Sequence, residues 1–298
     1  MKKLLLTGAS GFLGRNIIPE LRKSYEVTCL GRSSDNDVIA DLSEEEPVLK
    51  ERSDVVVHAA GKAHVVPKTE TEKSAFYKVN LGGTKHLCAA LEASGLPSCF
   101  VFISTVAVYG LDTGENISEE AELKGKTPYA ESKVQAERYL QEWCALHGVA
   151  LSILRLPLVA GANPPGNLGA MVRGIKTGRY LSIGKAQSKK SVVMALDVAR
   201  VIPALETNPD IYNLTDGYDP SFGELESLIS QMLGKRRPIA IPYWLACAMA
   251  KCGDLIGRKA PINSYKLGKI VNPLTFNSNK AQEKLAWAPL RVLDNFKI

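Results

Sequence analysis

Short apolar runs alternate with amphipathic stretches along the first half of the chain. The runs are rich in Val, Ile and Leu, show no clean alternation of apolar and polar positions, and end at turn residues. They predict six strands, at residues 2–8, 25–32, 37–42, 53–61, 99–110 and 149–161. Strands of this composition are buried on both faces, and helices between them indicate an α/β fold built on a parallel sheet.

Helical periodicity appears between these strands. Apolar positions three and four apart predict a helix over 71–94, and Thr127 with Pro128 begins another. The shorter elements predicted after residue 161 are a loop at 163–167 leading into a helix, a strand and helix within 191–206, a strand at 211–216, a helix at 221–233, a strand at 237–242 and a mostly helical tail from Tyr243. No linker interrupts the chain. We therefore expect a first domain over 1–162 and a smaller α/β region over 163–298 that partly shares its sheet and helices.

Composition narrows the class of protein. The 298 residues are 45% hydrophobic and 23% charged, as in soluble globular proteins, with a net charge of +6 and no basic run of the kind that binds nucleic acid. Six cysteines without a C-x-x-C pair and only four histidines argue against a metal site and favour the reducing cytoplasm. The initial "MKKLLL" is too short for a signal peptide, and no apolar stretch reaches the roughly 20 residues of a membrane span.

The stretch "TGASGFLG" follows the first predicted strand and opens a helix. It places Gly8, Gly11 and Gly14 at a spacing of three. Glycines are needed where the chain turns sharply, where the backbone approaches a pyrophosphate and where the helix packs on the strand, while the N-terminus of the helix attracts phosphate. A glycine-rich turn without a ligand is the alternative. The position of this turn in a parallel α/β pattern favours a doubly wound sheet of the Rossmann type that binds a dinucleotide.

The end of the second predicted strand bears on the choice of dinucleotide. Arg32 stands where NAD-specific proteins carry an acidic residue, and its planar guanidinium suits a 2′-phosphate. NADP is therefore favoured over NAD, although Arg32 stacked on the adenine or simply exposed is an alternative. Asp41 ends the third strand, where its carboxylate can accept from the adenine amino group. Small residues at 59–61 end the fourth strand and allow a cofactor to lie close.

Tyr129 and Lys133 lie four residues apart in "TPYAESKVQAE", hence on one face of the predicted helix. One interpretation is a packed tyrosine beside a solvated lysine. The other is a proton donor whose pKa the lysine adjusts, because a free tyrosine has a pKa near 10 and nearby positive charge favours the phenolate. Spacing alone does not decide between them, but the glycine-rich turn favours the second.

These motifs together resemble a known superfamily. "TGASGFLG", "HAAG", "STVAVYG", "PYAESK" and "LRLPLVAG" occur in an order similar to that of the extended short-chain dehydrogenase/reductases, in the branch of nucleotide-sugar epimerases, dehydratases and 4-keto reductases. The resemblance extends over nearly the whole chain, into "KAQEKLAWAP". It implies that Tyr129 is the general acid/base, that Lys133 supports it and binds the nicotinamide ribose, and that Thr105, rather than Ser104, is the catalytic hydroxyl.

The resemblance also implies binding residues. The expected cofactor contacts are Gly8, Ser10, Gly11, Phe12, Leu13, Gly14, Arg32, Asp41, Leu42, Ala59, Ala60, Gly61, Asn80, Tyr129, Lys133 and Pro157. The expected substrate contacts are Thr105, Asn167, Leu168 and Lys190, although Asn167 is equally suited to cap a helix. Lys190 stands where relatives often carry an arginine, and a lysine lacks its bidentate geometry. The "LVAG" stretch, where relatives often have Val-Tyr-Gly, is a second departure.

The apolar stretch "IPYWLACAMAKCGDLIG" in the tail has two interpretations. It is either a buried amphipathic helix or a surface for a lipid-linked or apolar substrate, with peripheral contact to a membrane. The sequence leaves open whether two copies form a homodimer.

The resemblance implies an NAD(P)-dependent enzyme that acts at C4 of a nucleotide-activated sugar, in the synthesis of surface polysaccharide precursors. Arg32 favours a 4-keto reductase that consumes NADPH, with a 4-epimerase as a close second. A 4,6-dehydratase is not expected, because Val106 and Ala107 stand where it needs an acid–base pair. The alternatives are an alcohol dehydrogenase of the hydroxysteroid or flavonoid type and a non-catalytic dinucleotide-binding sensor.

Overall fold

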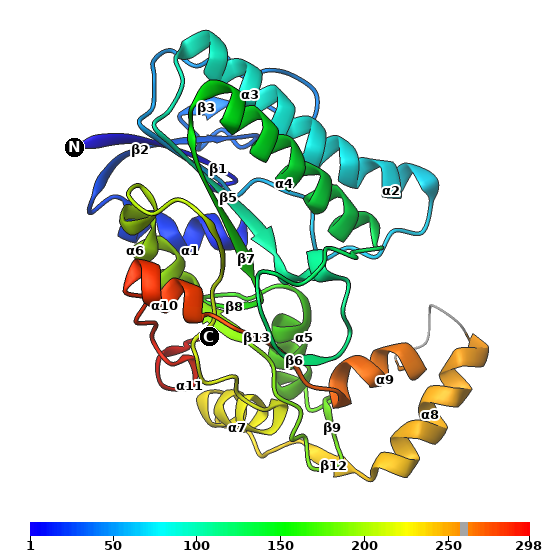
Figure 1. The fold of residues 1–298 in the computed structure, drawn as a ribbon. Helices are drawn as coiled ribbons and strands as arrows, with labels where there is room; N and C mark the ends of the chain where they lie inside the picture. Colours follow the sequence, from blue (N-terminus) through cyan, green and yellow to red (C-terminus); the bar gives the residue numbers. More distant parts are fainter. Residues whose placement is uncertain (257–261) are drawn as a thin grey trace.

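The computed structural model describes residues 1–256 and 262–298 (Figure 1). A parallel seven-stranded sheet, ordered β11-β7-β5-β4-β1-β2-β3, forms its centre and confirms the predicted fold class. The strands are β1 (Lys2–Thr7), β2 (Tyr25–Gly31), β3 (Val38–Ile39), β4 (Val55–His58), β5 (Cys99–Thr105), β7 (Ala150–Leu156) and β11 (Ile211–Asn213). After β3 the chain returns to the other side of β1, so the strand order reverses between β1 and β4. In open α/β sheets, ligands bind at the carboxyl ends of the strands at such a reversal.

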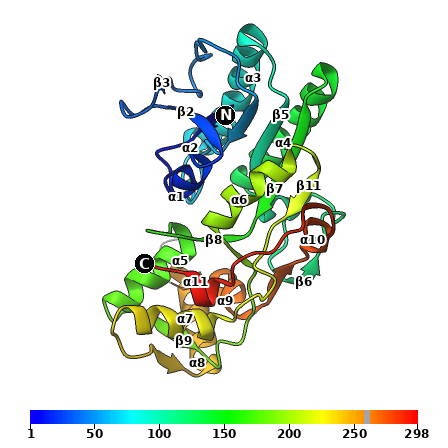
Figure 2. The same cartoon turned by 90° about the vertical axis from the view of Figure 1, so that its left-hand side faces the viewer.

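Helices cover both faces of this sheet, as the two views show (Figure 1, Figure 2). On one face, α1 (Phe12–Leu21), α6 (Ala195–Leu205) and α10 (Asn279–Leu285) bury their apolar sides in one core cluster. On the other face, α3 (Gly83–Ser94) and α4 (Pro128–His147) do the same in a second cluster. Burial on both faces explains the continuous apolar runs of the strands.

Several predicted strands are shorter in the structure, and two of the apolar runs leave the central sheet partway. The run at 99–110 leaves the sheet after Thr105, where the 3₁₀ helix η2 (Val106–Tyr109) begins and the Thr105 side chain accepts the Ala107 N–H at 3.2 Å. The run at 149–161 divides at Pro157, which has no N–H for a ladder. Its second part, β8 (Leu158–Ala160), pairs with β10 (Val192–Met194) outside the central sheet.

The predicted helix at 71–94 is also interrupted. It consists of α2 (Glu70–Tyr77), a π-helical turn η1 (Lys78–Gly82) and α3. Apolar periodicity does not distinguish such a turn from regular helix, since the turn adds one residue without breaking the helix. Turns of this kind are frequent at functional sites.

The second half of the chain forms a smaller α/β region. Its helices are α5 (Gly166–Lys176), α7 (Phe222–Met232), α8 (Tyr243–Ile256), α9 (Ser264–Val271) and α11 (Val292–Asn295). Two parallel pairs accompany them, β9 (Leu181–Ile183) with β12 (Ile239–Ile241) and β6 (Gly114–Ile117) with β13 (Leu274–Phe276). Ser221 and Glu224 form a capping box at α7. Because β11, α6 and α10 belong to the central sheet and its layers, the division at residue 162 stays a prediction.

Candidate active site

Three glycines form the turn between β1 and α1. Gly8 has a φ of 75°, and a Cβ there would lie 2.6 Å from the Ala60 nitrogen. A Cβ at Gly14 would lie 2.3 Å from the Gly8 carbonyl oxygen. Side chains are excluded from both positions, so the backbone packs closely at the strand-order reversal. α1 begins after Gly11 without a side-chain cap, and its first N–H groups therefore suit the phosphates of a dinucleotide.

A buried chain of hydrogen bonds supports this turn. The Thr84 hydroxyl donates to the Asn80 carbonyl (2.6 Å), so it accepts from Nε2 of His58 (3.0 Å). Nδ1 of His58 then accepts from the Thr7 hydroxyl (2.6 Å), whose oxygen accepts the Ala60 N–H (3.1 Å). Burial lowers the pKa of His58 to about 3, which agrees with this neutral tautomer. The chain joins the ends of β1 and β4 to η1.

Asn80, in η1, connects the loop after β4 to α4. Its buried side-chain amide accepts the Lys62 N–H at 2.7 Å and donates to the Lys62 carbonyl (3.2 Å) and to Ser132 Oγ (2.9 Å). A Cβ at Gly61 would lie 3.1 Å from Asn80 Oδ1. Asn80 therefore shapes the backbone beside the glycine-rich turn while its own amide hydrogens are in use.

Arg32 and Asp41 lie together beyond the ends of β2 and β3. The Arg32 side chain is 79% exposed, and its Nη1 lies 3.7 Å from Asp41 Oδ2. Asp41 Oδ1 accepts both the N–H (2.9 Å) and the hydroxyl (2.7 Å) of Ser43. Burial raises the pKa of the Asp41 carboxyl, but the bonds from Ser43 and the charge of Arg32 outweigh it and leave the pKa lowered. The Arg32 guanidinium is thus the solvent-facing group at this end of the site.

Thr105 and Tyr129 meet at the end of β5 and the first turn of α4. Thr127 caps α4 by accepting the Ala130 N–H at 3.2 Å, which sets the direction of Tyr129 one residue after Pro128. Burial raises the pKa of the Tyr129 phenol, and a side-chain hydrogen bond with Thr105 opposes that rise. The Thr105 hydroxyl, whose oxygen accepts the Ala107 N–H, is thus the polar neighbour of the Tyr129 phenol.

Lys133 lies one helical turn after Tyr129 and is 4% exposed. Its Nζ donates one of three N–H groups to the Ile103 carbonyl at 2.6 Å and lies 3.8 Å from the centroid of the Phe102 ring. Burial lowers the pKa of Lys133 to about 7, against the opposing charge of Glu137. A buried ammonium with so few partners suits a group that binds a ligand rather than a solvated surface charge.

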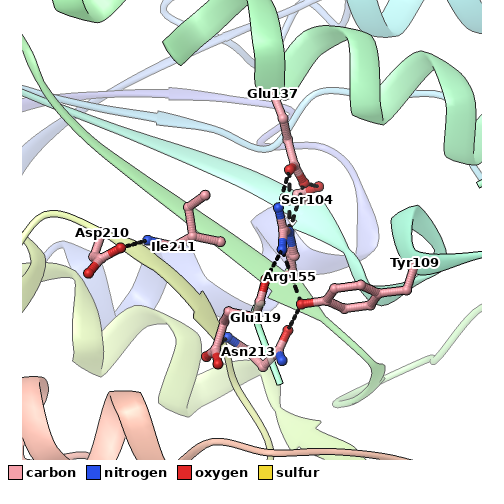
Figure 3. A network of polar contacts seen from close by, with 8 residues as sticks. All are labelled: Ser104, Tyr109, Glu119, Glu137, Arg155, Asp210, Ile211 and Asn213. Atoms are coloured by element: carbon pink, nitrogen blue, oxygen red, sulfur yellow. Dashed lines mark hydrogen bonds and ion pairs between the residues drawn. The ribbon is translucent and has the colours of Figure 1, made fainter. Parts of the chain in front are cut away.

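A second buried network lies beside these residues (Figure 3). Arg155, on β7, pairs with Glu137 of α4 at 2.8 Å, and their side chains are 4% and 1% exposed. The Ser104 hydroxyl donates to Glu137, while Arg155 donates to the Tyr109 hydroxyl at 3.2 Å, which donates to Asn213 at 2.7 Å. These contacts fix α4 against β5, β7 and β11. They were not predicted from the sequence, although an arginine within the apolar run "LSILRLPL" was a signal.

The predicted substrate residues differ in exposure and in the groups that they offer to a ligand. Asn167 is exposed in the first turn of α5, which begins at Gly166 and has no side-chain cap. The Leu168 side chain is buried in the core of the smaller region. Lys190 is 8% exposed, donates to the Asn272 carbonyl at 2.7 Å, and has its pKa lowered to about 8 by burial and then by Lys269. Asn167 and Lys190 thus present polar groups, whereas Leu168 offers only its backbone.

The remaining predicted cofactor residues differ in exposure. Ser10 is exposed, Phe12 and Leu13 are half-buried at the start of α1, and Pro157 is half-buried after β7. The Leu42 side chain is in the core, and its carbonyl accepts from Nδ1 of His86 at 2.7 Å. In the part of the chain that the structure describes, no three His, Cys, Asp or Glu side chains gather as metal ligands do.

Known proteins share both this sequence pattern and this fold. A family model described as the NAD dependent epimerase/dehydratase family matches residues 4–215. The N-acetyl-alpha-D-glucosaminyl-diphospho-ditrans,octacis-undecaprenol 4-epimerase of Escherichia coli O157:H7 is 27% identical, over 96% of this chain and 90% of that protein. The UDP-glucose 4-epimerase of Vibrio cholerae is 27% identical over 99% and 94%. The GDP-6-deoxy-D-mannose reductase of Pseudomonas aeruginosa is 26% identical over 78% and 80%.

Solved structures agree with the fold. The UDP-glucose 4-epimerase of Thermotoga maritima with UDP-glucose aligns with a TM-score of 0.73 and 21% identity, covering 98% of this chain and 95% of that one. RMD from Pseudomonas aeruginosa complexed with NADPH aligns at 0.71 and 21%, with the same coverage. The family match covers most of the chain and includes the glycine-rich turn, Thr105, Tyr129 and Lys133. The chain belongs to the NAD-dependent epimerase/dehydratase family.

Proposed function

We propose that this protein is an NAD(P)-dependent enzyme that changes the oxidation state or configuration at C4 of a diphosphate-activated sugar. The observation that carries the proposal is the meeting of Thr105, Tyr129 and Lys133 at the carboxyl ends of the strands, beside a glycine-rich turn. Proton transfer, a charge that stabilises phenolate and a phosphate-binding helix end are what such a reaction needs.

The residues of the turn fit a dinucleotide. Backbone fills the space that a Cβ at Gly8 or Gly14 would occupy, and the uncapped start of α1 offers N–H groups for the pyrophosphate. Lys133 would hold the ribose of the nicotinamide, and Arg32 a 2′-phosphate where one is present. When bound, the nicotinamide supplies the chemistry of hydride transfer to or from the sugar carbon.

The chain's own residues then move the proton. The Thr105 hydroxyl lies beside the Tyr129 phenol and would donate to Oη, which would leave the phenol proton available to the C4 oxygen of the sugar. In reduction Tyr129 gives up this proton, and in oxidation its phenolate accepts one. Positive charge on Lys133, one helical turn after Tyr129, would favour the phenolate.

Two reactions compete within this proposal. The exposed guanidinium of Arg32 supports a 4-keto reductase that consumes NADPH. The two 4-epimerases among the relatives support an enzyme that retains its cofactor and inverts C4. Purified protein that carries bound NAD favours the epimerase, while protein that binds and releases NADPH favours the reductase.

The test of the mechanism is Tyr129→Phe. We expect turnover of UDP-, dTDP- or GDP-linked 4-keto or 4-hydroxy hexoses to fall at least about a hundredfold, the scale of general acid–base catalysis. Affinity for the dinucleotide should stay within about twofold, because the phenol oxygen adds little to binding. Wild-type turnover in this variant contradicts the proposed role of Tyr129. Turnover of a sterol alcohol but of no sugar substrate would instead support the hydroxysteroid class.

A further inference from the structure

α8 exposes apolar side chains on the side opposite its core contacts. Its buried residues, Ala246, Ala250 and Gly253, share one face and pack towards α9 in a small core. The opposite face carries Trp244 and Leu255, which are 70% and 90% exposed. A helix that is apolar on all sides is normally buried, so this outward face calls for an explanation.

Other apolar side chains are exposed on the flanks of α8 and on the elements near it. They are Tyr243 (55%) and Met249 (39%) of α8, Leu181 (44%) of β9, Ile239 (75%) of β12 and Tyr265 (55%) of α9. We call this set, with Trp244 and Leu255, the apolar tip. In both views α8 lies at the end of the molecule farthest from β1 and β2 (Figure 1, Figure 2).

Positive charge is concentrated in the same segment. Residues 235–272 contain eight lysines and arginines and one aspartate, Asp254, which gives a formal charge of +7 against +6 for the whole chain. The basic residues do not form one run, so no basic motif marks them in the sequence. Lys235, Arg236, Arg237 and Lys251 are exposed beside the apolar tip.

We propose that the apolar tip docks on the surface of an anionic lipid bilayer. Aromatic and aliphatic side chains with surrounding lysines and arginines are the composition of interfacial membrane-binding surfaces. A second copy of the chain fits this face poorly, because a symmetric contact would bring together two sets of the exposed cations Lys235, Arg236, Arg237 and Lys251. No helix within residues 1–256 and 262–298 has the length and apolarity for a bilayer crossing. The tip therefore lies on the membrane and does not span it.

Docking has a consequence for the substrate that rests on the proposed function. A sugar diphosphate attached to a polyprenyl chain stays with its head group at the membrane surface, where a docked enzyme meets it. The substrate of the reaction is then a polyprenyl-diphosphate sugar, which has the diphosphate and sugar of a nucleotide sugar but no nucleobase. The docking itself does not depend on this reaction.

Tryptophan fluorescence tests the docking directly. Of the chain's three tryptophans, Trp143 and Trp287 are 5% and 8% exposed, so Trp244 is the one that lipid contact can change. Vesicles with equal parts of phosphatidylglycerol and phosphatidylcholine should shift the emission to shorter wavelength, while pure phosphatidylcholine should shift it much less. Trp244→Phe should still float with the anionic vesicles but show no shift. Failure of the wild-type protein to float overturns the proposal.

Paired variants separate the contribution of positive charge to docking from that of apolar contact. Arg236→Gln with Arg237→Gln should lower the partition coefficient on anionic vesicles about 30-fold, since each cation near such a surface contributes about fivefold. Met249→Ser with Leu255→Ser should lower it on both vesicle types. The matched controls are Lys50→Gln with Lys68→Gln, and Leu146→Ser, whose residue is 80% exposed on α4. Partition that falls equally in the control variants contradicts the assigned surface.

Sedimentation and turnover distinguish docking from self-association and from catalysis. Sedimentation of the free protein reports whether a second copy covers the tip, and a dimer that Trp244→Glu dissociates overturns the proposal. Turnover is compared between a polyprenyl-diphosphate sugar in anionic vesicles and a soluble nucleotide sugar. Wild-type turnover in Tyr129→Phe with unchanged flotation identifies a failure of the proposed catalytic role alone. Turnover on nucleotide sugars by a wild-type protein that does not float identifies a failure of docking alone.

Discussion

Replacement of Lys133 by methionine should change how the stability of the cofactor-free protein depends on pH. Lys133 is 4% exposed, and burial lowers its pKa to about 7 from 10.5. Glu137 and the Ile103 carbonyl offset part of the cost of burying the ammonium, and His58 nearby is neutral. Methionine preserves most of the volume and removes the titrating group.

The sign follows from proton uptake in the two states. Between pH 7 and 10.5 the unfolded chain binds a proton at Lys133 and the folded chain largely does not, so stability rises with pH across this window. Below pH 7 both states are protonated and the contribution is constant. The separation of the two pKa values corresponds to about 5 kcal/mol, of which about 3 kcal/mol is gained between pH 6 and 9.

The assay is urea unfolding of the cofactor-free protein at pH 6, 7, 8 and 9. The free energy of unfolding of wild type, relative to that of Lys133→Met, should increase by about 3 kcal/mol across the series. Lys190→Met should show a smaller effect, because the pKa of Lys190 is lowered only to about 8. The free energy of unfolding of wild type, relative to that of Lys190→Met, should increase by about 1.5 kcal/mol. Lys50→Met, at an exposed site, should follow wild type. Parallel curves for wild type and Lys133→Met would refute the reasoning.

Three further predictions concern the supports of the site. Gly8→Ala should abolish dinucleotide binding in a fluorescence titration, because a Cβ would meet backbone at 2.6 Å. The control is Gly148→Ala, at a φ of 66° with nothing within 4 Å of the added Cβ. It should lower the free energy of unfolding by only about 1 kcal/mol and bind the dinucleotide normally. Arg155→Met should cost about 3–5 kcal/mol in urea unfolding by leaving Glu137 buried without its partner, and Glu137→Leu added to it should restore most of that loss. His58 should stay neutral, protonated on Nε2, from pH 5 to 9 in long-range ¹H–¹⁵N spectra.

Much of the central sheet was predictable because its signals are local. A strand buried on both faces is a continuous apolar run, and Gly8 and Gly14 are required because backbone atoms lie where their Cβ atoms would be. Tyr129 and Lys133 follow from a local helical spacing, whereas Thr105 was expected only from the family resemblance. Their proximity in the structure rests on α4 packing against β5, which pairs between β4 and β7, and no local pattern in the sequence gives that strand order.

Elements that depend on distant partners were less predictable. β6 is only four residues long and pairs with β13, more than a hundred residues later, so neither has a strong local pattern. β8 leaves the central sheet because Pro157 interrupts the ladder, although the apolar run continues through it. The exposed side of α8 was not predictable either, since an apolar run does not show which face of a helix is covered.

Ser104, Glu137 and Arg155 were not predicted from the sequence. They explain how α4 holds a face of ionisable side chains inside the protein. Tyr129, Lys133 and Glu137 are spaced by four, so they share the side of α4 that lies on β5 and β7. Burying this face costs free energy that apolar residues would not, because Lys133 has lost most of its hydration. Arg155 neutralises Glu137 one turn beyond Lys133, and Ser104 joins that pair to the strand residue before Thr105. The ion pair thus fixes the register of α4 on β5, so a disturbance at Arg155 should reach Tyr129 through helix position and not through direct contact.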